Sequence, residues 1–148
     1  MTTLQIGKKT YEAKTNFKFE KLADKKYRSE DEENRMSGLE TIYQDLLSFK
    51  SSALISFWDC ATAHYKKDQP SVDDIEEALE EVIEDEGTDR LFKEAFTSLD
   101  ESGFFRKQLN EFWKNLDLAE SMAKDEKELE QIQTAKRMYN EKRKELKA

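Results

Sequence analysis

Thirteen consecutive residues, Glu101–Trp113, contain three Phe and one Trp in a chain that is otherwise highly charged. The whole sequence has only four Gly and one Pro, so it offers little turn chemistry for a many-stranded sheet and favours helices. At helical spacing, the apolar stripe of this segment consists of Phe105, Leu109, Phe112 and Leu116. The segment must be a core element or a partner-binding surface. The candidates for partner contact are Phe104, Phe105, Phe112 and Trp113.

The composition permits a folded core despite the high charge. Apolar residues make up 36% and charged residues 39% of the 148 residues. Nine Phe, five Tyr and two Trp offset this balance, because each aromatic side chain buries a large area. We predict a mainly α fold, in which a short N-terminal β-hairpin is followed by a compact bundle of five to six helices and a charged C-terminal helix or tail.

Residues 3–14 have the alternating pattern of a β-hairpin. Leu4 and Ile6 alternate with polar residues. A turn follows at Gly7, and Tyr11 resumes the alternation. A lone hairpin is marginally stable in water, so it must pack on the rest of the molecule or pair with another chain. We therefore name Leu4, Ile6 and Tyr11 as candidates for self-association.

Capping residues predict where the helices begin, because Ser, Thr, Asp and Asn side chains accept hydrogen bonds from free N–H groups in the first turn. The expected starts of this kind are Thr15 or Asn16, Ser51 or Ser52, Ser71, and Thr88-Asp89. A further helix is expected to begin near Gly38, because an apolar stripe starts at Leu39. The helix that begins at Ser51 or Ser52 is expected to reach Tyr65, and the one that begins at Ser71 to end at Gly87. Residues 28–37 have no apolar period and indicate a solvated loop, in which Ser29 and Glu32 permit an extra helical turn.

The pattern changes after Leu116. Apolar residues from Leu118 to Leu146 follow a weak heptad rhythm that charged residues interrupt. A solvated helix, frayed or disordered at its end, fits this pattern better than a stable coiled coil. We therefore divide the chain into a helical domain with its hairpin at residues 1–116 and a charged, helical or partly disordered tail at residues 117–148.

Charge and hydropathy limit the classes of partner. The formal net charge is −8, and residues 73–86 carry nine acids and no base. This excess argues against nucleic acid as the partner, although the basic segment 1–28 leaves that alternative open. No apolar run approaches the roughly twenty residues of a membrane span, and no secretion signal is visible, so no membrane partner and a cytosolic location are expected.

The sequence offers no catalytic or cofactor-binding constellation. Asp59, Cys60 and His64 lie close together, but the chain has no second His or Cys to complete a zinc shell. No third group is evident to orient a Cys–His nucleophile pair. The paired acids of residues 73–86 line a helix face, where charges usually serve only as a solvated surface. Scattered Gly residues exclude a phosphate-binding loop. We expect neither an enzyme nor a bound metal or cofactor.

The order of several segments resembles the tail assembly chaperones of long-tailed, siphovirus-type phages and prophages of Gram-positive bacteria. Residues 4–11 and 16–24 resemble the short hairpin of that family and its first helix, and Gly38–Tyr43 resembles the start of its second helix. Residues 69–79 and Glu101–Arg106 resemble later landmarks. The resemblance covers roughly residues 3–116.

This resemblance implies a protein made late in infection, in the host cytoplasm, that is absent from the mature virion. Such a protein binds the long, helical tape measure protein, keeps it soluble and recruits the major tail-tube protein, directly or through a longer frameshifted form. Members of the family also tend to form homo-oligomers. The alternative is a small acidic helical adaptor or regulator of a host or phage protein, acting through residues 73–86.

Overall fold

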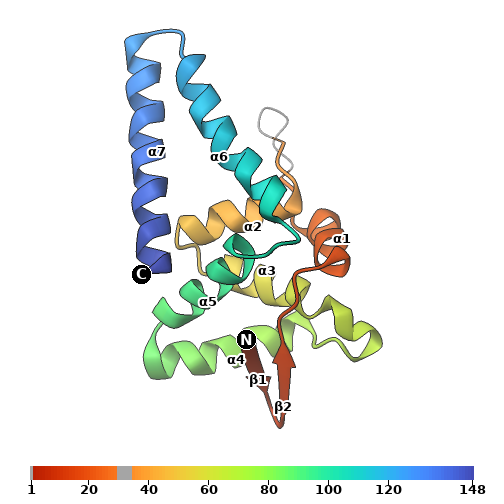
Figure 1. Cartoon of the computed structure of the whole chain (residues 1–148). Coiled ribbons are helices and arrows are strands. Elements are labelled where there is room, and N and C mark those ends of the chain that lie inside the picture. Colours follow the sequence, from red (N-terminus) through yellow and green to blue (C-terminus); the bar gives the residue numbers. More distant parts are fainter. Residues whose placement is uncertain (1, 30–34) are drawn as a thin grey trace.

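The computed structural model describes residues 2–29 and 35–148, and it is mainly α-helical with one small antiparallel sheet (Figure 1). The suggested extra helical turn at Ser29 and Glu32 lies largely outside the described residues. The elements in chain order are β1 (Thr3–Ile6), β2 (Lys9–Glu12), α1 (Phe17–Lys26), α2 (Gly38–Leu47), α3 (Ser52–Ala61), the 3-10 helix η1 (Ala63–Asp68), α4 (Val72–Glu86), α5 (Asp89–Asp100), α6 (Arg106–Ser121) and α7 (Glu126–Lys147). The predicted fold class is confirmed.

The N-terminal hairpin forms with the predicted alternation. Leu4 lies opposite Tyr11 in the antiparallel ladder, and Leu4 is buried whereas its neighbours Thr3 and Gln5 are exposed. The two-residue turn begins at Gly7, whose φ of 62° is a left-handed conformation that glycine adopts without steric cost. The hairpin packs on the body of the molecule, with β1 against α4.

Side-chain caps start several helices where the sequence indicates them. Asn16 and Ser71 each accept a hydrogen bond from a first-turn N–H of the helix that follows, and Ser37, which falls in the segment expected to be a loop, caps α2 in the same way. Ser51 and Thr88 precede α3 and α5 as expected, but their side chains make no capping hydrogen bond. The third helix is shorter than expected, because α3 ends at Ala61 and the chain continues as η1. At this point the Thr62 hydroxyl donates to the carbonyl of Trp58, which is one of the last carbonyls of α3.

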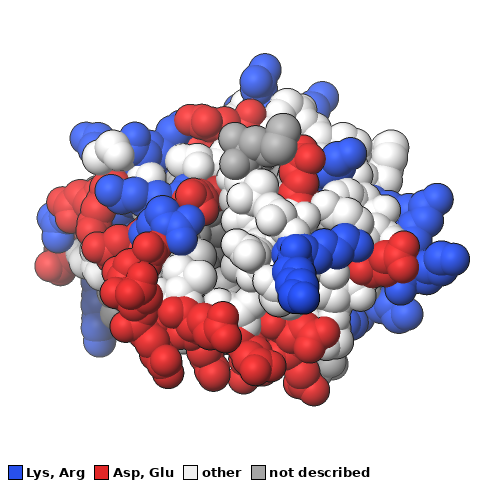
Figure 2. Space-filling model, turned by 90° about the horizontal axis from the view of Figure 1, so that it is seen from below, with Lys and Arg blue, Asp and Glu red and all other residues white. Residues whose placement is uncertain are grey.

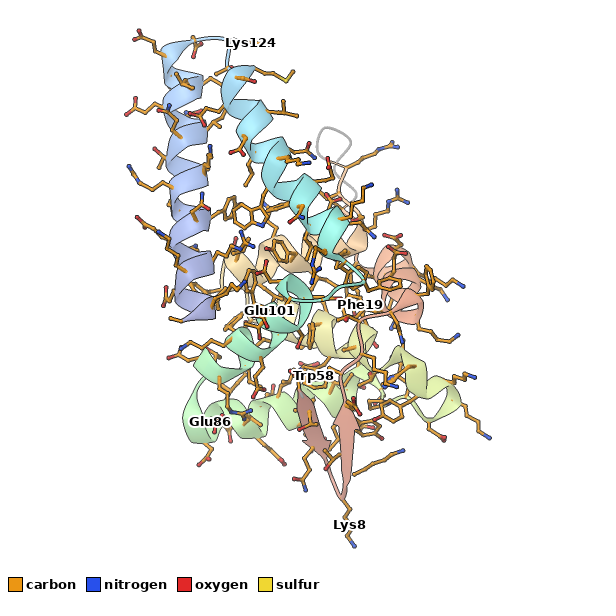
Figure 3. The ribbon with its side chains drawn as sticks, in the orientation of Figure 1. Lys8, Phe19, Trp58, Glu86, Glu101 and Lys124 are labelled. Carbon is orange, nitrogen blue, oxygen red and sulfur yellow. The ribbon has the colours of Figure 1, made fainter. Side chains whose placement is uncertain are left out.

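The core lies between α1, α2, α3 and α5, where aromatic and aliphatic side chains of all four helices meet. Its largest fully buried side chains are Trp58, Tyr43, Phe19, Phe57, Phe96 and Phe105. Figure 3 marks Phe19 and Trp58 within this centre. α4 covers α3 on the side of the hairpin, so the acidic helix forms one outer layer of the body.

Helices α6 and α7 form an antiparallel pair that projects from the body (Figure 1). Lys124 marks the outer end of this pair, and Lys8 marks the hairpin tip at the opposite end of the molecule (Figure 3). The C-terminal half of α7 returns to α2 and α5. Helix α6 continues through the domain boundary expected at residue 116 and ends at Ser121. The division into a domain at residues 1–116 and a tail at residues 117–148 stays a prediction. Within the described residues, no helix is both long and apolar enough to cross a membrane.

Candidate partner-binding surfaces

The aromatic segment divides into buried and exposed residues. Phe105 and Phe112 are buried, which confirms the core interpretation of their stripe. Phe104 is 40% exposed, and Trp113 is half-buried. Helix α6 begins only at Arg106, so Phe104 and Phe105 lie in the turn that precedes it and point to opposite environments. The role of all four residues in partner binding stays a prediction. Among them, only Phe104 is exposed.

Trp113 is oriented by polar and aromatic contacts with the body. Its indole N–H donates to the Tyr43 hydroxyl at 2.9 Å, and the Tyr43 hydroxyl donates to Asp100 at 2.6 Å. The Arg143 guanidinium lies 4.9 Å from the centre of the indole ring. Burial, followed by the hydrogen bond to Asp100, raises the pKa of Tyr43 above its ordinary value, so this phenol stays protonated as a donor.

Two exposed Phe side chains form an aromatic ledge, defined here as Phe17 and Phe104. Phe17, the first residue of α1, is 65% exposed, and its ring meets Phe104 edge-on at 4.7 Å. Phe104 in turn contacts the buried Phe105 at 5.0 Å, edge-on. The ledge is therefore an outward extension of the core. Neighbouring Arg106 and Lys107 are exposed, so a basic border adjoins it.

Polar contacts hold the two halves of the ledge together, although they are far apart in sequence. The hydroxyl oxygens of Thr15 and Ser102 lie 3.0 Å apart. The side-chain amide of Gln108, in the first turn of α6, donates to the Glu20 carboxylate of α1 at 2.8 Å. These contacts fix the turn before α6 against α1. Two aromatic rings held in place lose little side-chain entropy on binding, which suits them as anchors for a partner.

Sequence periodicity did not identify Phe17 as a surface residue. The expected stripe of α1 used Phe19, and two positions along a helix correspond to a rotation of about 200°. Phe17 therefore faces away from the buried stripe, and this spacing is the signal that could have found it. Its contact with Phe104 depends on the tertiary structure, because residues 17 and 104 belong to elements that the sequence does not relate.

The acidic face of α4 is a second candidate surface. All nine carboxylates of residues 73–86 are exposed. Figure 2 shows Asp and Glu side chains gathered in a band along one edge of the molecule. Asp73 and Asp74 lie in the first turn of the helix, where negative charge complements the helix dipole. The remaining carboxylates repel one another and create a negative potential over this edge.

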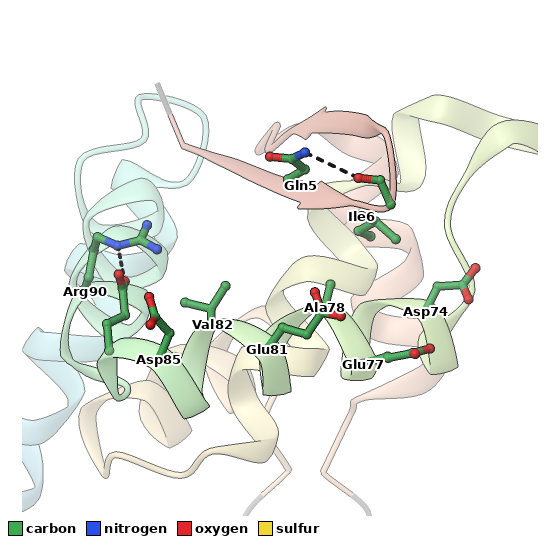
Figure 4. Close-up of a pocket in the computed structure, with 11 residues that line it drawn as sticks. Gln5, Ile6, Asp74, Glu77, Ala78, Glu81, Val82, Asp85 and Arg90 are labelled. Carbon is green, nitrogen blue, oxygen red and sulfur yellow. Dashed lines mark hydrogen bonds and ion pairs between the residues drawn. The ribbon is translucent and has the colours of Figure 1, made fainter.

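A groove of about 600 Å³ lies along the junction of α4 and the hairpin (Figure 4). Its apolar floor includes Ile6, Ala78 and Val82. Carboxylates line its α4 side, namely Asp74, Glu77, Glu81, Asp85 and Glu86. At one end Arg90 pairs with Glu86 and Glu94, and these hydrogen bonds raise the pKa of its guanidinium. An extended basic segment with apolar side chains fits such a groove by charge and hydropathy.

The three hairpin candidates for self-association differ in exposure. Leu4 and Tyr11 are buried, and Ile6 is partly buried beside the groove. The Tyr11 ring meets Tyr65 edge-on at 5.0 Å, and the Tyr65 hydroxyl accepts a hydrogen bond from the backbone N–H of Glu12. The hairpin thus uses Leu4 and Tyr11 to pack on its own chain. Self-association through these residues stays a prediction.

Asp59, Cys60 and His64 do not converge on a common point. The buried Asp59 carboxylate accepts hydrogen bonds from Lys26 at 2.9 Å and Tyr27 at 2.7 Å, which ties α3 to α1. Burial, followed by the charge of Asp59, raises the pKa of the Cys60 thiol, which disfavours a thiolate nucleophile. Burial also lowers the pKa of His64, whose ring packs on Tyr65. In residues 2–29 and 35–148, no three His, Cys, Asp or Glu side chains are grouped to hold a metal ion.

Comparisons with known proteins assign the family. The model of the family described as phage tail assembly chaperone protein, TAC, matches residues 3–114, which include the hairpin, helices α1 to α5 and half of α6. Searches of curated proteins and of solved structures found no match. Family membership implies a chaperone role rather than a catalytic one. Because the match extends over most of the sequence, this chain belongs to the phage tail assembly chaperone family.

Proposed function

We propose that this protein binds the tape measure protein of a siphovirus-type phage of Gram-positive bacteria and keeps it soluble until the tail tube forms. The family match over residues 3–114 carries this proposal. In the host cytoplasm, the chaperone coats the client and helps to recruit the major tail-tube protein, directly or through a frameshifted longer form. It then leaves the assembly and is absent from the virion. Several copies associate along the client.

The aromatic ledge supports the proposal with a suitable contact. Phe17 and Phe104 present two rings edge-on to each other, and the exposed bases Arg106 and Lys107 border them. An amphipathic client helix could place apolar side chains on the rings and acidic side chains on the bases. Such a contact is small and shallow, so later displacement by tube subunits does not require extraction from a deep pocket.

Coexpression with the tape measure protein tests this function. The chaperone should raise the soluble yield of the client several-fold, and the double change Phe17→Ser and Phe104→Ser should remove most of that gain. The matched control is Leu118→Ser with Met138→Ser, which alters two other exposed apolar residues. Indifference of the client to the unmodified chaperone would contradict the function. Equal loss in the ledge variant and in its control would contradict only the role of the ledge.

The acidic groove favours a second candidate function, that of an adaptor or regulator that binds a basic segment of a host or phage protein. Charge reversal by Glu77→Lys and Glu81→Lys should then abolish binding of that partner, whereas Glu126→Lys and Glu141→Lys on α7 should not. All four positions are exposed, so the substitutions alter charge without disturbing the core. Binding should also weaken as salt concentration rises. A salt-independent interaction would contradict this candidate.

A further inference from the structure

The C-terminal half of α7 packs on α2, α5 and α6, and the surface that it covers there is called the α7 groove. Phe49 and Phe92 form its apolar end, where their rings meet edge-on at 5.6 Å and Leu146 is buried beside them. Phe49 has a φ of 55°, a strained conformation for a residue other than glycine, and it directs its ring to this site. Trp113 lines the groove further along.

A single buried carboxylate holds the basic side chains of α7 in this groove. Asp100, whose side chain is 2% exposed, lies 3.2 Å from Arg143 and 2.7 Å from Lys147. One turn further along, the Gln44 amide donates to the Tyr139 hydroxyl at 2.9 Å. The Lys142 ammonium also lies 5.5 Å from the centre of the Phe49 ring. The contacts of α7 therefore fall at positions 139, 142, 143, 146 and 147, which share one helix face.

Helix α7 itself contributes little apolar area to this contact. Of its 22 residues, only Leu146 is buried. Its first half reaches α6 through pairs at the surface, such as Lys136 with Asp117 and Glu120. Surface ion pairs contribute little to stability. Elements with few buried apolar contacts open most readily, so α7 is the helix that should detach first.

The residues that form the α7 groove lie inside the segment matched by the family, and α7 lies outside it. Tyr43, Phe49, Phe92, Asp100 and Trp113 all lie within the matched residues 3–114, whereas α7 lies outside them. The body thus has an aromatic groove with a buried anionic residue, and this chain covers that groove with its own helix. A tethered helix competes at high effective concentration with any other occupant.

We propose that α7 is a displaceable internal occupant of a helix-binding groove, and that a basic amphipathic helix of a partner protein takes its place. The pattern of α7 defines the partner: an aromatic residue at position i, Arg or Lys at i+4 and i+8, and Leu at i+7. That this partner belongs to the tape measure protein rests on the proposed function. The client must displace α7 before it binds, and the free energy of this step lowers its affinity for the groove. Weaker binding favours release of the client during tube assembly.

A synthetic peptide of residues 124–148 tests the groove without any client. The full chain with Arg143→Glu and Lys147→Glu, the latch variant, should release its own α7 and bind the labelled peptide at least tenfold more tightly than the unmodified chain. The control, Lys127→Glu with Lys144→Glu, makes the same change in net charge at exposed positions of α7. Equal affinity of all three proteins, or no binding by the latch variant, would overturn the proposal.

Hydrogen exchange on the unmodified chain keeps the proposal testable if the latch variant misfolds. Amides of α7 should exchange at least tenfold faster than those of α2 and α3, because α7 detaches without unfolding of the core. Exchange of all three helices at the same rate, through global unfolding alone, would contradict a displaceable helix.

Coexpression with the tape measure protein separates the failure of this inference from failure of the proposed function. The latch variant should solubilise more client than the control. If the unmodified chain solubilises the client and the latch variant does no better than the control, the displacement inference is wrong and the proposed function stands. If no form solubilises the client, the proposed function fails, whereas peptide binding by the latch variant still supports the groove.

Discussion

A Cβ atom at Gly38 would lie 2.0 Å from the carbonyl oxygen of Ala23, so the first turn of α2 rests directly on the backbone of α1. The Gly38 N–H donates to the Asp24 side chain at 2.9 Å, which reinforces this crossing. The close approach allows Phe19 of α1 to reach the centre of the core. Ser37 caps α2 immediately before Gly38, so the residue that starts the helix and the residue that packs it on α1 are adjacent in the sequence.

Gly38→Ala should destabilise the protein by at least about 2 kcal/mol, because backbone atoms cannot yield to the added methyl group as a side chain could. Gly103→Ala is the matched control, since a Cβ atom there meets nothing within 4 Å. The control should change the free energy of unfolding by less than about 0.5 kcal/mol. Urea denaturation measures both changes. Similar values for the two variants would show that α1 and α2 are not in backbone contact.

Phe19→Ala and Phe17→Ala should differ sharply in stability, although the residues are two positions apart on α1. Phe19 is fully buried and contacts the rings of Phe57 and Phe105. Its truncation should cost about 3–5 kcal/mol, the range for a large core residue. Phe17 is mostly exposed, and the loss of its edge-on contact should cost about 1 kcal/mol. Thermal or urea denaturation distinguishes these values, and equal costs would refute the orientation of α1.

Asp100 should make the stability of the chain sensitive to acid. Burial alone would raise the pKa of this carboxyl, but hydrogen bonds from Lys147 and Tyr43 and the charge of Arg143 hold it below its ordinary value. The folded state then binds a proton at Asp100 less readily than the unfolded state does. The stabilisation is complete above a pH of about 4 and is lost as the pH falls through the lowered pKa.

Asp100→Asn measures this contribution. At pH 7 the variant should be less stable than the unmodified chain by on the order of 2 kcal/mol, because hydrogen bonds to a charged group are lost. The difference should shrink as the pH falls below about 4, because the unfolded state then takes up a proton at Asp100 before the native carboxyl does. Urea denaturation at a series of pH values gives the comparison. A difference that is constant with pH would exclude Asp100 as the source.

Cys60 should not react with a thiol reagent while the protein is folded. It is buried, and burial together with the charge of Asp59 raises the pKa of the thiol, so the reactive thiolate is scarce. Ellman's reagent should label Cys60 only in denaturant. The folded chain should react at least about a hundredfold more slowly. Rapid labelling of the native protein would reopen the question of cysteine chemistry.

Local sequence signals predicted most of the secondary structure. Asn16 and Ser71 cap helices as expected, and the alternation of Leu4 and Tyr11 places both residues on the packed face of the hairpin. The end of α3 was predicted less well, because the expected helix continued to Tyr65. The α-helix ends at Ala61, where the Thr62 hydroxyl donates to the carbonyl of Trp58, and a 3-10 helix follows. The apolar pattern carries no strong signal for this change.

The candidate surfaces could be predicted only in part. The acidic face of α4 follows from composition, since nine carboxylates on one helix cannot all be buried. Helical spacing placed Phe105 in the apolar stripe, and Phe105 is buried. The exposure of Phe104 could not be derived, because Phe104 lies in the turn before α6, where helical periodicity does not apply. The pairing of Asp100 with Arg143 and Lys147 was also beyond sequence reasoning, since many acids and bases compete as partners.

The sequence by itself determined a helical chain with an N-terminal hairpin, an acidic helix and an aromatic segment, because period, capping and charge act over a few neighbouring residues. Only the tertiary structure decided that Phe17 meets Phe104 at the surface and that Asp100 holds the end of α7. These contacts join residues 87 and 43 or more positions apart in sequence. They depend on how packed helices cross, and close packing in a shared core sets those crossings.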